Sequence, residues 1–165
     1  MLEPAQARPY DRIIELLRSA GVDFRVIEHE PVRTSEEAAH VRGTPLEQGA
    51  KALVLRAGDS FVMAVISAAR RIDFQKLKHL LGTEKPSFAS PDEVDEQTGC
   101  PPGGVPPFGN LFGLRVVMDP TLAELERIDF NAGERTRSIE MSSADYIRIV
   151  RPEIADIAKD EPKPL

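Results

Sequence analysis

The sequence has few of the residues that stabilise secreted or membrane proteins: its 165 residues include one cysteine, no tryptophan and 5% aromatic residues. The single cysteine, Cys100, cannot form an internal disulfide, which favours a reducing compartment. The most apolar stretch, residues 50–69, is interrupted by Arg56, Gly58 and Asp59, so it is too broken to span a bilayer. The N-terminus lacks the apolar segment of a secretion signal. We therefore expect a cytoplasmic protein that does not enter a membrane.

Basic residues are also in deficit, because 21 Lys and Arg stand against 27 Asp and Glu and give a net charge of −6. This charge disfavours a protein that coats long nucleic acid by counterion release, so DNA is not an expected partner. A local basic excess remains within residues 70–85, which predicts either a solvated helix face or a contact with RNA phosphates. Its basic residues are Arg70, Arg71, Lys76, Lys78 and Lys85.

The apolar spacing predicts short helices and strands that alternate along the chain. Helices are expected over residues 11–20 and 74–81, and after the capping residues Thr34, Thr44, Ser90 and Ser142. Strands are expected over residues 22–27, 50–56, 61–67, 111–118, 128–131 and 138–141. Several spacers are too short for parallel crossovers, so we expect one α+β domain with a mixed, mostly antiparallel sheet. Residues 10–152 form this domain, between a flexible N-terminus at 1–9 and a loose tail at 153–165.

The most unusual segment is TGCPPGGVPPFGN, residues 98–110, which holds four of the 14 prolines and four of the 11 glycines. Proline restricts φ and glycine permits positive φ, so this mixture sets the directions of backbone N–H and C=O groups. Two interpretations are open. The segment is either a rigid surface turn without a ligand or a loop that binds a small polar group through its backbone.

Individual reactive side chains give weaker signals. In the strand at 50–56, Lys51 lies on the same face as Leu53 and Leu55, and its amine either reaches solvent from the strand end or faces a cleft and binds an anion. Cys100 adjoins the Gly/Pro segment, yet the sequence shows no base that would activate its thiol. The three histidines are scattered, and no zinc or Ser/His/Asp motif is present, so we predict no metal and no cofactor. His29 is either a structural histidine or a pocket residue.

Fragments taken in order resemble the YbaK/prolyl-tRNA-synthetase-associated editing domain family over about residues 10–150. They are KALVLR, KLKHLLG, FASPDEV, TGCPPGGVPPFG and FNAGERTRSIEMSSAD. Members of this family are freestanding or synthetase-inserted deacylases that hydrolyse wrongly charged aminoacyl-tRNA, chiefly tRNA(Pro) that carries Ala, Cys or another small amino acid. The resemblance implies a compact, β-barrel-like mixed sheet with short helices around it.

The resemblance also implies a role for particular residues. Lys51 would contact the 3′-terminal nucleotide or position the ester, and the backbone of the loop would hold the aminoacyl group and orient water. The loop residues are Gly103, Gly104, Val105, Pro106 and Pro107. Hydrolysis would be assisted by the ribose hydroxyl of the tRNA, with no side-chain nucleophile. By their place in the matching fragments, the pocket candidates are His29, Thr34, Phe108, Gly109, Asn131 and Ser138. The tRNA-binding candidates are Arg70, Arg71, Lys76, Lys78, Arg135 and Arg137.

The implied partner is mischarged tRNA, in particular the acceptor end of tRNA(Pro), and prolyl-tRNA synthetase is a second candidate. Certain family members carry an acid at the position aligned with Ser138, so Cys-specific activity is not assumed. No ATP-binding loop or synthetase motif is visible, and the chain could therefore remove an amino acid but not attach one. Two alternatives stay open: a noncatalytic module that binds tRNA ends, an amino acid or a synthetase, and a thiol hydrolase that uses Cys100.

Overall fold

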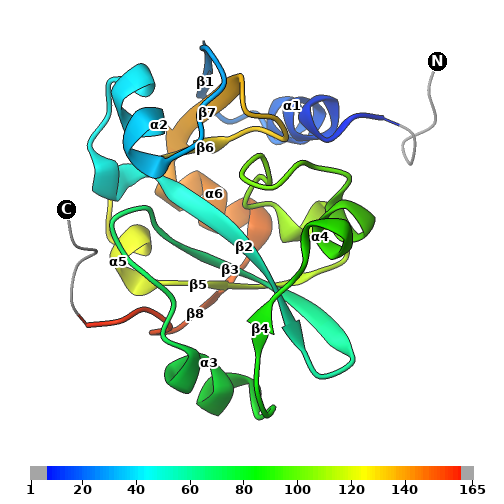
Figure 1. Ribbon diagram of the computed structural model, residues 1–165. Coiled ribbons are helices and arrows are strands. Elements are labelled where there is room, and N and C mark those ends of the chain that lie inside the picture. Colours follow the sequence, from blue (N-terminus) through cyan, green and yellow to red (C-terminus); the bar gives the residue numbers. More distant parts are fainter. Residues whose placement is uncertain (1–6, 161–165) are drawn as a thin grey trace.

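Strands and short helices alternate along the chain in the computed structural model, which describes residues 7–160 (Figure 1). The α-helices are α1 (Pro9–Ser19), α2 (Ser35–Arg42), α3 (Phe74–Leu81), α4 (Pro91–Thr98), α5 (Pro120–Ala123) and α6 (Ser143–Val150). The 3₁₀ turns are η2 (Leu46–Gln48) and η3 (Gly109–Leu111). The strands are β1 (Phe24–Glu28), β2 (Ala50–Ala57), β3 (Ser60–Ser67), β4 (Ser87–Phe88), β5 (Arg115–Met118), β6 (Arg127–Asn131), β7 (Arg137–Ser142) and β8 (Glu153–Ile154).

Side-chain caps determine where four of the helices begin. The side chains of Thr34, Asp73, Ser90 and Ser142 each accept a backbone N–H from the first turn of α2, α3, α4 and α6. Such a bond satisfies an N–H that has no partner inside the helix. These four helix starts agree with the starts predicted from the sequence. The expected cap at Thr44 is wrong, because the 3₁₀ turn η2 begins after Pro45 and has no side-chain cap.

The strands form two sheets. One is antiparallel throughout, in the order β1-β7-β6, and the other has the order β4-β2-β3-β5-β8. In the second sheet β2 pairs antiparallel with β3 and β4, whereas the β3–β5 and β5–β8 pairs are parallel. A bridge between Gly49 and Asp129 joins the start of β2 to β6. The α+β class and the mostly antiparallel pairing are confirmed, and the strands form two sheets rather than one barrel-like sheet.

Apolar side chains from both sheets and from α1 and α6 pack into the main core. The Phe108 ring lies at its centre, edge-on to Phe130 at 5.3 Å and to Tyr146 at 5.4 Å between ring centroids. The Tyr146 hydroxyl donates a hydrogen bond to the carbonyl of Pro107. The Gly/Pro loop is therefore anchored to the core at its C-terminal end, which fixes its position beside β6.

Several expected boundaries are wrong. The fold extends past the expected boundary at residue 152, because β8 pairs with β5 and Ile157 and Ala158 are fully buried. The expected strand at 111–118 begins only at Arg115, after η3. Helix α1 begins at Pro9, which the sequence placed in the flexible N-terminus. Residues 1–6 and 161–165, the rest of the two expected loose ends, lie outside the described residues.

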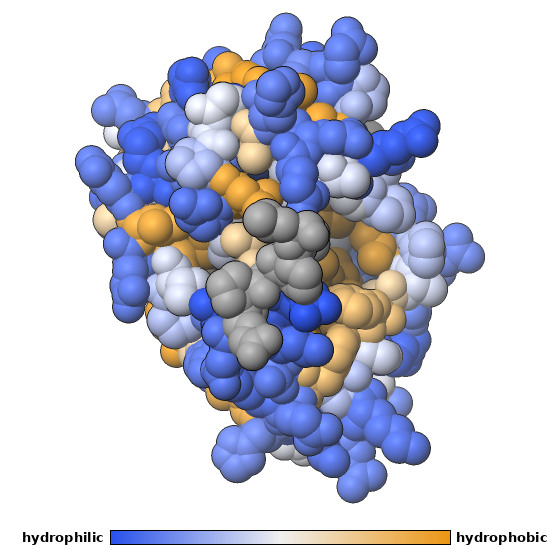
Figure 2. Space-filling view, turned by 60° about the vertical axis from the view of Figure 1, so that its left-hand side comes forward, coloured by the Kyte–Doolittle hydropathy of each residue, from blue (hydrophilic) through white to orange (hydrophobic). Residues whose placement is uncertain are grey.

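The surface of the described chain is mixed. Figure 2 shows one face on which hydrophilic residues predominate and hydrophobic residues gather in separate small patches. Among residues 7–160, no helix has the length and apolarity needed to cross a membrane.

Candidate active site

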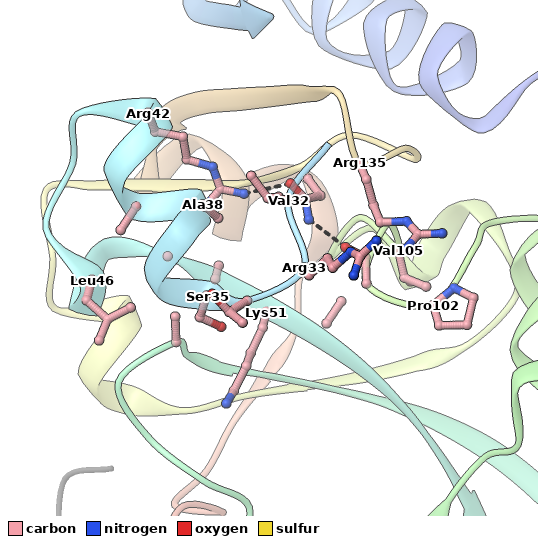
Figure 3. Close-up of a pocket in the computed structure, with 18 residues that line it drawn as sticks. Val32, Arg33, Ser35, Ala38, Arg42, Leu46, Lys51, Pro102, Val105 and Arg135 are labelled. Atoms are coloured by element: carbon pink, nitrogen blue, oxygen red, sulfur yellow. Dashed lines mark hydrogen bonds between the residues drawn. The ribbon is translucent and has the colours of Figure 1, made fainter. Parts of the chain in front are cut away.

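A cavity of about 190 Å³ lies between α2, the first residues of β2 and the Gly/Pro loop (Figure 3). Five alanines from α2, β2 and the residue after β3 contribute to its lining. These are Ala38, Ala39, Ala50, Ala52 and Ala68. Val32, Leu46 and Val105 add apolar surface, and Thr34 and Ser35 add hydroxyl groups. A cavity of this size suits a small side chain.

Two glycines let the loop approach the cavity closely. Gly103 has a φ of +81°, a conformation that residues with a Cβ rarely adopt. At Gly104 a Cβ would lie 3.0 Å from Pro101 Cγ and 3.2 Å from Glu134 Cα. A larger residue at 104 would push the loop away from the turn between β6 and β7. Gly103 is therefore required by its backbone conformation, and Gly104 by the closeness of its neighbours.

The loop has few backbone donors to offer a ligand. Pro102, Pro106 and Pro107 carry no N–H, and the N–H of Gly104 is donated to the Pro101 carbonyl at 2.9 Å. Of the loop residues that line the cavity, only Gly103 and Val105 carry an N–H, so these two groups are the candidate donors to an oxyanion. This is the kind of preorganised donor that stabilises negative charge in ester hydrolysis.

Basic side chains surround the cavity although the chain as a whole is acidic. Arg33, Lys51 and Arg135 all line it. Figure 3 shows the Arg33 and Arg135 guanidinium groups on the side of the loop, whereas the Lys51 side chain extends from β2 in the opposite direction. Guanidinium and ammonium groups bind phosphate and carboxylate oxygens through charge-assisted hydrogen bonds. The cavity is thus suited to a ligand with a small apolar or polar part and nearby anionic groups.

A buried polar network forms the back of the cavity, with Arg42 at its centre. The Arg42 side chain is 6% exposed and donates to Asp129 Oδ1 at 2.7 Å, to Ser138 Oγ at 2.8 Å and to Asn131 Oδ1 at 2.8 Å. Burial lowers the pKa of Arg42 and raises that of Asp129, and the attraction between their charges opposes both shifts. Asn131 Nδ2 in turn donates to the Gly103 carbonyl.

The structure brings together part of the predicted site. Six of the predicted residues line the cavity, namely Thr34, Lys51, Gly103, Val105, Asn131 and Arg135. His29 and Ser138 lie behind it, with His29 Nε2 2.7 Å from Ser138 Oγ. Gly104, Pro106 and Pro107 are buried and do not line the cavity. Phe108 and Gly109 do not line this cavity, because Phe108 lies in the core and a Cβ at Gly109 would lie 2.5 Å from Val116 Cγ2.

Three of the six predicted tRNA-binding residues have side-chain partners within the protein. Lys76 Nζ lies 3.0 Å from Asp156 and 2.7 Å from Asp160, and Arg70 donates to the carbonyl of Lys159 at 2.6 Å. The Arg137 guanidinium lies 4.4 Å from the centre of the Tyr10 ring. Arg71 and Lys78 are exposed. Helix α3, which carries Lys76 and Lys78, lies at the opposite end of the molecule from α2 (Figure 1).

Sequence reasoning missed Arg33, Ser35 and Arg42. Arg33 and Ser35 flank the predicted cap Thr34, so the short segment before α2 was a signal that could have extended the site. No sequence signal pointed to Arg42, because a basic residue in the last turn of a helix normally compensates the helix dipole in solvent. Its partners on β6 and β7 are 87 to 96 residues away in the chain.

Cys100 lies in the core and does not line the cavity. Its side chain is fully buried, and its Sγ donates to the Thr98 carbonyl at 3.5 Å. Burial raises the pKa of the thiol to about 11, so the thiolate is scarce at neutral pH. Among residues 7–160, no three His, Cys, Asp or Glu side chains are grouped to bind a metal ion.

Comparison with known proteins places the chain in a family. The model of the aminoacyl-tRNA editing domain matches residues 29–149. The multifunctional Ser/Thr-tRNA deacylase ProXp-y of Escherichia coli (strain K12) is 41% identical over 91% of this chain and 93% of its own length. The prolyl-tRNA editing protein ProX of Acetoanaerobium sticklandii is 28% identical over 84% of this chain and 88% of its own length.

A solved structure agrees with these relatives. A crystal structure described as a proposed trans-editing enzyme for prolyl tRNA synthetase superposes with a TM-score of 0.82 at 26% identity, over 96% of this chain and 99% of that one. The range that matches the family model includes every residue that lines the cavity. This chain therefore belongs to the aminoacyl-tRNA editing domain family.

Proposed function

We propose that this chain, an aminoacyl-tRNA deacylase of the editing family, acts in trans and removes serine and threonine from mischarged tRNA(Pro). The observation that carries the proposal is the cavity of about 190 Å³, lined by alanines and closed by the Gly103 loop. The name of the Escherichia coli relative supports serine and threonine as substrates, and the names of the prolyl-tRNA relatives support tRNA(Pro). Its substrate forms where translation occurs, so we place the activity in the cytoplasm.

The lining of the cavity favours a small side chain that carries a hydroxyl. The alanines add little bulk to the lining, whereas the hydroxyls of Thr34 and Ser35 and the guanidinium of Arg42 supply hydrogen-bond partners. A prolyl group brings a rigid ring with no hydroxyl. One methylene group changes discrimination by only ~1–3 kcal/mol, so selectivity against proline rests on both shape and unpaired polar groups.

The basic residues around the cavity support a nucleic-acid end as the carrier of the amino acid. Arg33, Lys51 and Arg135 line the cavity, and in this proposal they bind the phosphates next to the esterified ribose. A few such contacts are enough for a transient encounter, and they position the tRNA without reading its bases. The net charge of −6 suits this local mode of binding rather than the coating of long RNA.

The reaction needs no covalent intermediate with the protein. The oxygen of a water molecule attacks the ester carbonyl carbon, the bond from that carbon to the ribose oxygen breaks, and the ribose oxygen takes up a proton. The products are a free amino acid and uncharged tRNA. None of the histidines lines the cavity, so Ser35 and Thr34 have no imidazole base there. Positioning and charge stabilisation by Gly103, Val105 and Lys51 are then the main contributions of the protein.

The test is to measure deacylation of tRNA(Pro) that carries Ser, Thr, Ala, Cys or Pro as separate substrates. We expect the seryl and threonyl esters to be hydrolysed at least about tenfold faster than the prolyl ester, which corresponds to ~1.4 kcal/mol of discrimination. Equal hydrolysis of the prolyl ester would contradict the proposed selectivity. Binding of tRNA without hydrolysis of any ester would contradict deacylation and identify a noncatalytic module that binds tRNA ends.

Replacement of Cys100 by alanine is expected to leave the initial rate of deacylation unchanged. The thiol is buried away from the cavity and carries a proton at neutral pH. The substitution is expected to lower the free energy of unfolding instead, because a buried sulfur atom is lost and a small void remains. Initial rates normalised to the folded fraction check the prediction, and loss of activity in a folded variant would restore the thiol-hydrolase interpretation.

A further inference from the structure

We infer that Arg42 is a positioning residue of this site, and that it acts through Asn131 on the backbone of the Gly103 loop. The inference rests on the proposed function, since its consequence is measured as ester hydrolysis. Its basis is a chain of hydrogen bonds that runs from Arg42 to Asn131 Oδ1 and from Asn131 Nδ2 to the Gly103 carbonyl. The dashed lines in Figure 3 follow this chain from Arg42.

The two ends of the chain allow only one orientation of the Asn131 amide. A guanidinium can only donate hydrogen bonds, so the atom that faces Arg42 must be the amide oxygen. A carbonyl can only accept, so the atom that faces Gly103 must be the amide nitrogen. A flipped amide would oppose donor to donor and acceptor to acceptor. Arg42 therefore determines that Asn131 presents a donor to the loop.

Arg42 is itself held in place by groups that prevent rotation of its guanidinium plane. Asp129 is fully buried and accepts from Arg42 Nη1, while Ser138, also fully buried, accepts from Nε. Asp129 Oδ2 further accepts from Gln48 Nε2 at 2.9 Å. Three separate acceptors thus use the fork of donors that only arginine supplies. A lysine could balance the negative charge of Asp129, but it could not donate hydrogen bonds in the three directions that arginine uses.

Within the loop, this chain holds one particular peptide unit. The carbonyl of Gly103 and the N–H of Gly104 belong to the same planar group. Asn131 binds the carbonyl, and the Pro101 carbonyl binds the N–H at 2.9 Å. With this plane fixed at both ends, the neighbouring N–H groups of Gly103 and Val105 have defined directions beside the cavity. Both glycines are flexible by nature, so without the Asn131 contact the plane can rotate.

The experiment compares Asn131→Asp and Arg42→Lys with the wild type and with the matched control Asn110→Asp, an exposed residue outside the cavity. Asn131→Asp retains an acceptor for Arg42 and loses the donor to Gly103. Arg42→Lys retains the charge and loses the fork. In both variants we expect kcat on the preferred ester to fall at least about tenfold, with the melting temperature of Asn131→Asp not reduced. Asn110→Asp should match the wild type.

A second readout is independent of catalysis. The backbone amide signals of Gly103, Gly104 and Val105 in a ¹H–¹⁵N NMR spectrum should shift in Asn131→Asp and Arg42→Lys and stay in place in Asn110→Asp. Unchanged loop signals together with a wild-type kcat in Asn131→Asp would overturn the inference, as would an effect on KM alone. A wild type that hydrolyses no ester would contradict the proposed function instead, and the loop signals would still decide whether Arg42 and Asn131 position the loop.

Discussion

Replacement of Lys51 by alanine is expected to lower the rate of deacylation of the preferred ester by roughly one to three orders of magnitude, comparable with the loss of one preorganised donor. Lys51 lies at the start of β2, opposite Ile66 of β3, and lines the same cavity as Gly103 and Asn131. If the tRNA end binds at this cavity as proposed, the Lys51 ammonium would favour the approach of phosphate and the charge that develops on the ester oxygens. Initial rates at saturating and at low substrate separate an effect on chemistry from one on binding.

The matched control is Lys78→Ala, the same change at an exposed lysine on α3, at the opposite end of the molecule from α2 (Figure 1). It removes an equal charge, so it measures the general attraction of tRNA to the protein. If the Lys78 variant loses as much activity as the Lys51 variant, Lys51 has no special place in the site and the basic segment at 70–85 is a tRNA contact. If only the Lys51 variant is impaired, the effect belongs to the cavity.

Helices and strands that are determined by residues close to them in the chain could be predicted from the sequence. Helix α3 lies between Asp73 and Gly82 as predicted, because the carboxylate cap and the left-handed glycine act within a few residues. The hairpin of β2 and β3 also agrees with its two apolar runs. Strands β4 and β8 were missed because two residues contain no period to detect. They exist only because β2 and β5 offer free edges to segments far along the chain.

The same distinction explains the site. The Gly/Pro loop and Lys51 could be singled out because unusual composition and a charge on an apolar strand are visible in a single segment, and the family resemblance then implied their roles. Phe108 was misplaced because an apolar residue after a loop faces either a pocket or the core, and only Tyr146 and Phe130 decide between them. Arg42 was missed because it lies at the end of α2, whereas its partners Asp129 and Asn131 lie on β6, more than 80 residues along the chain.

Replacement of Asp129 by asparagine is expected to lower the free energy of unfolding by about 3–5 kcal/mol, the cost of breaking a buried ion pair from one side. Asp129 is fully buried and accepts from Arg42 at 2.7 Å and from Gln48 at 2.9 Å. An asparagine has one oxygen, so its NH₂ group would meet one of these donors, and the buried guanidinium would lose its counter-charge. Urea unfolding at neutral pH, extrapolated to water, measures the loss.

The control is the same substitution in an exposed pair, Asp145→Asn. Asp145 lies 2.8 Å from Arg148, whose side chain is 64% exposed, and such pairs contribute ~1 kcal/mol or less. A small loss of unfolding free energy in both variants would mean that water already screens the Arg42–Asp129 pair.

Removal of both charges gives a further check. The double variant Arg42→Met with Asp129→Leu should lose less unfolding free energy than the sum of the two single changes, because no unpaired charge stays buried. The double variant should nevertheless lose deacylation, since Asn131 would no longer be held toward the Gly103 carbonyl.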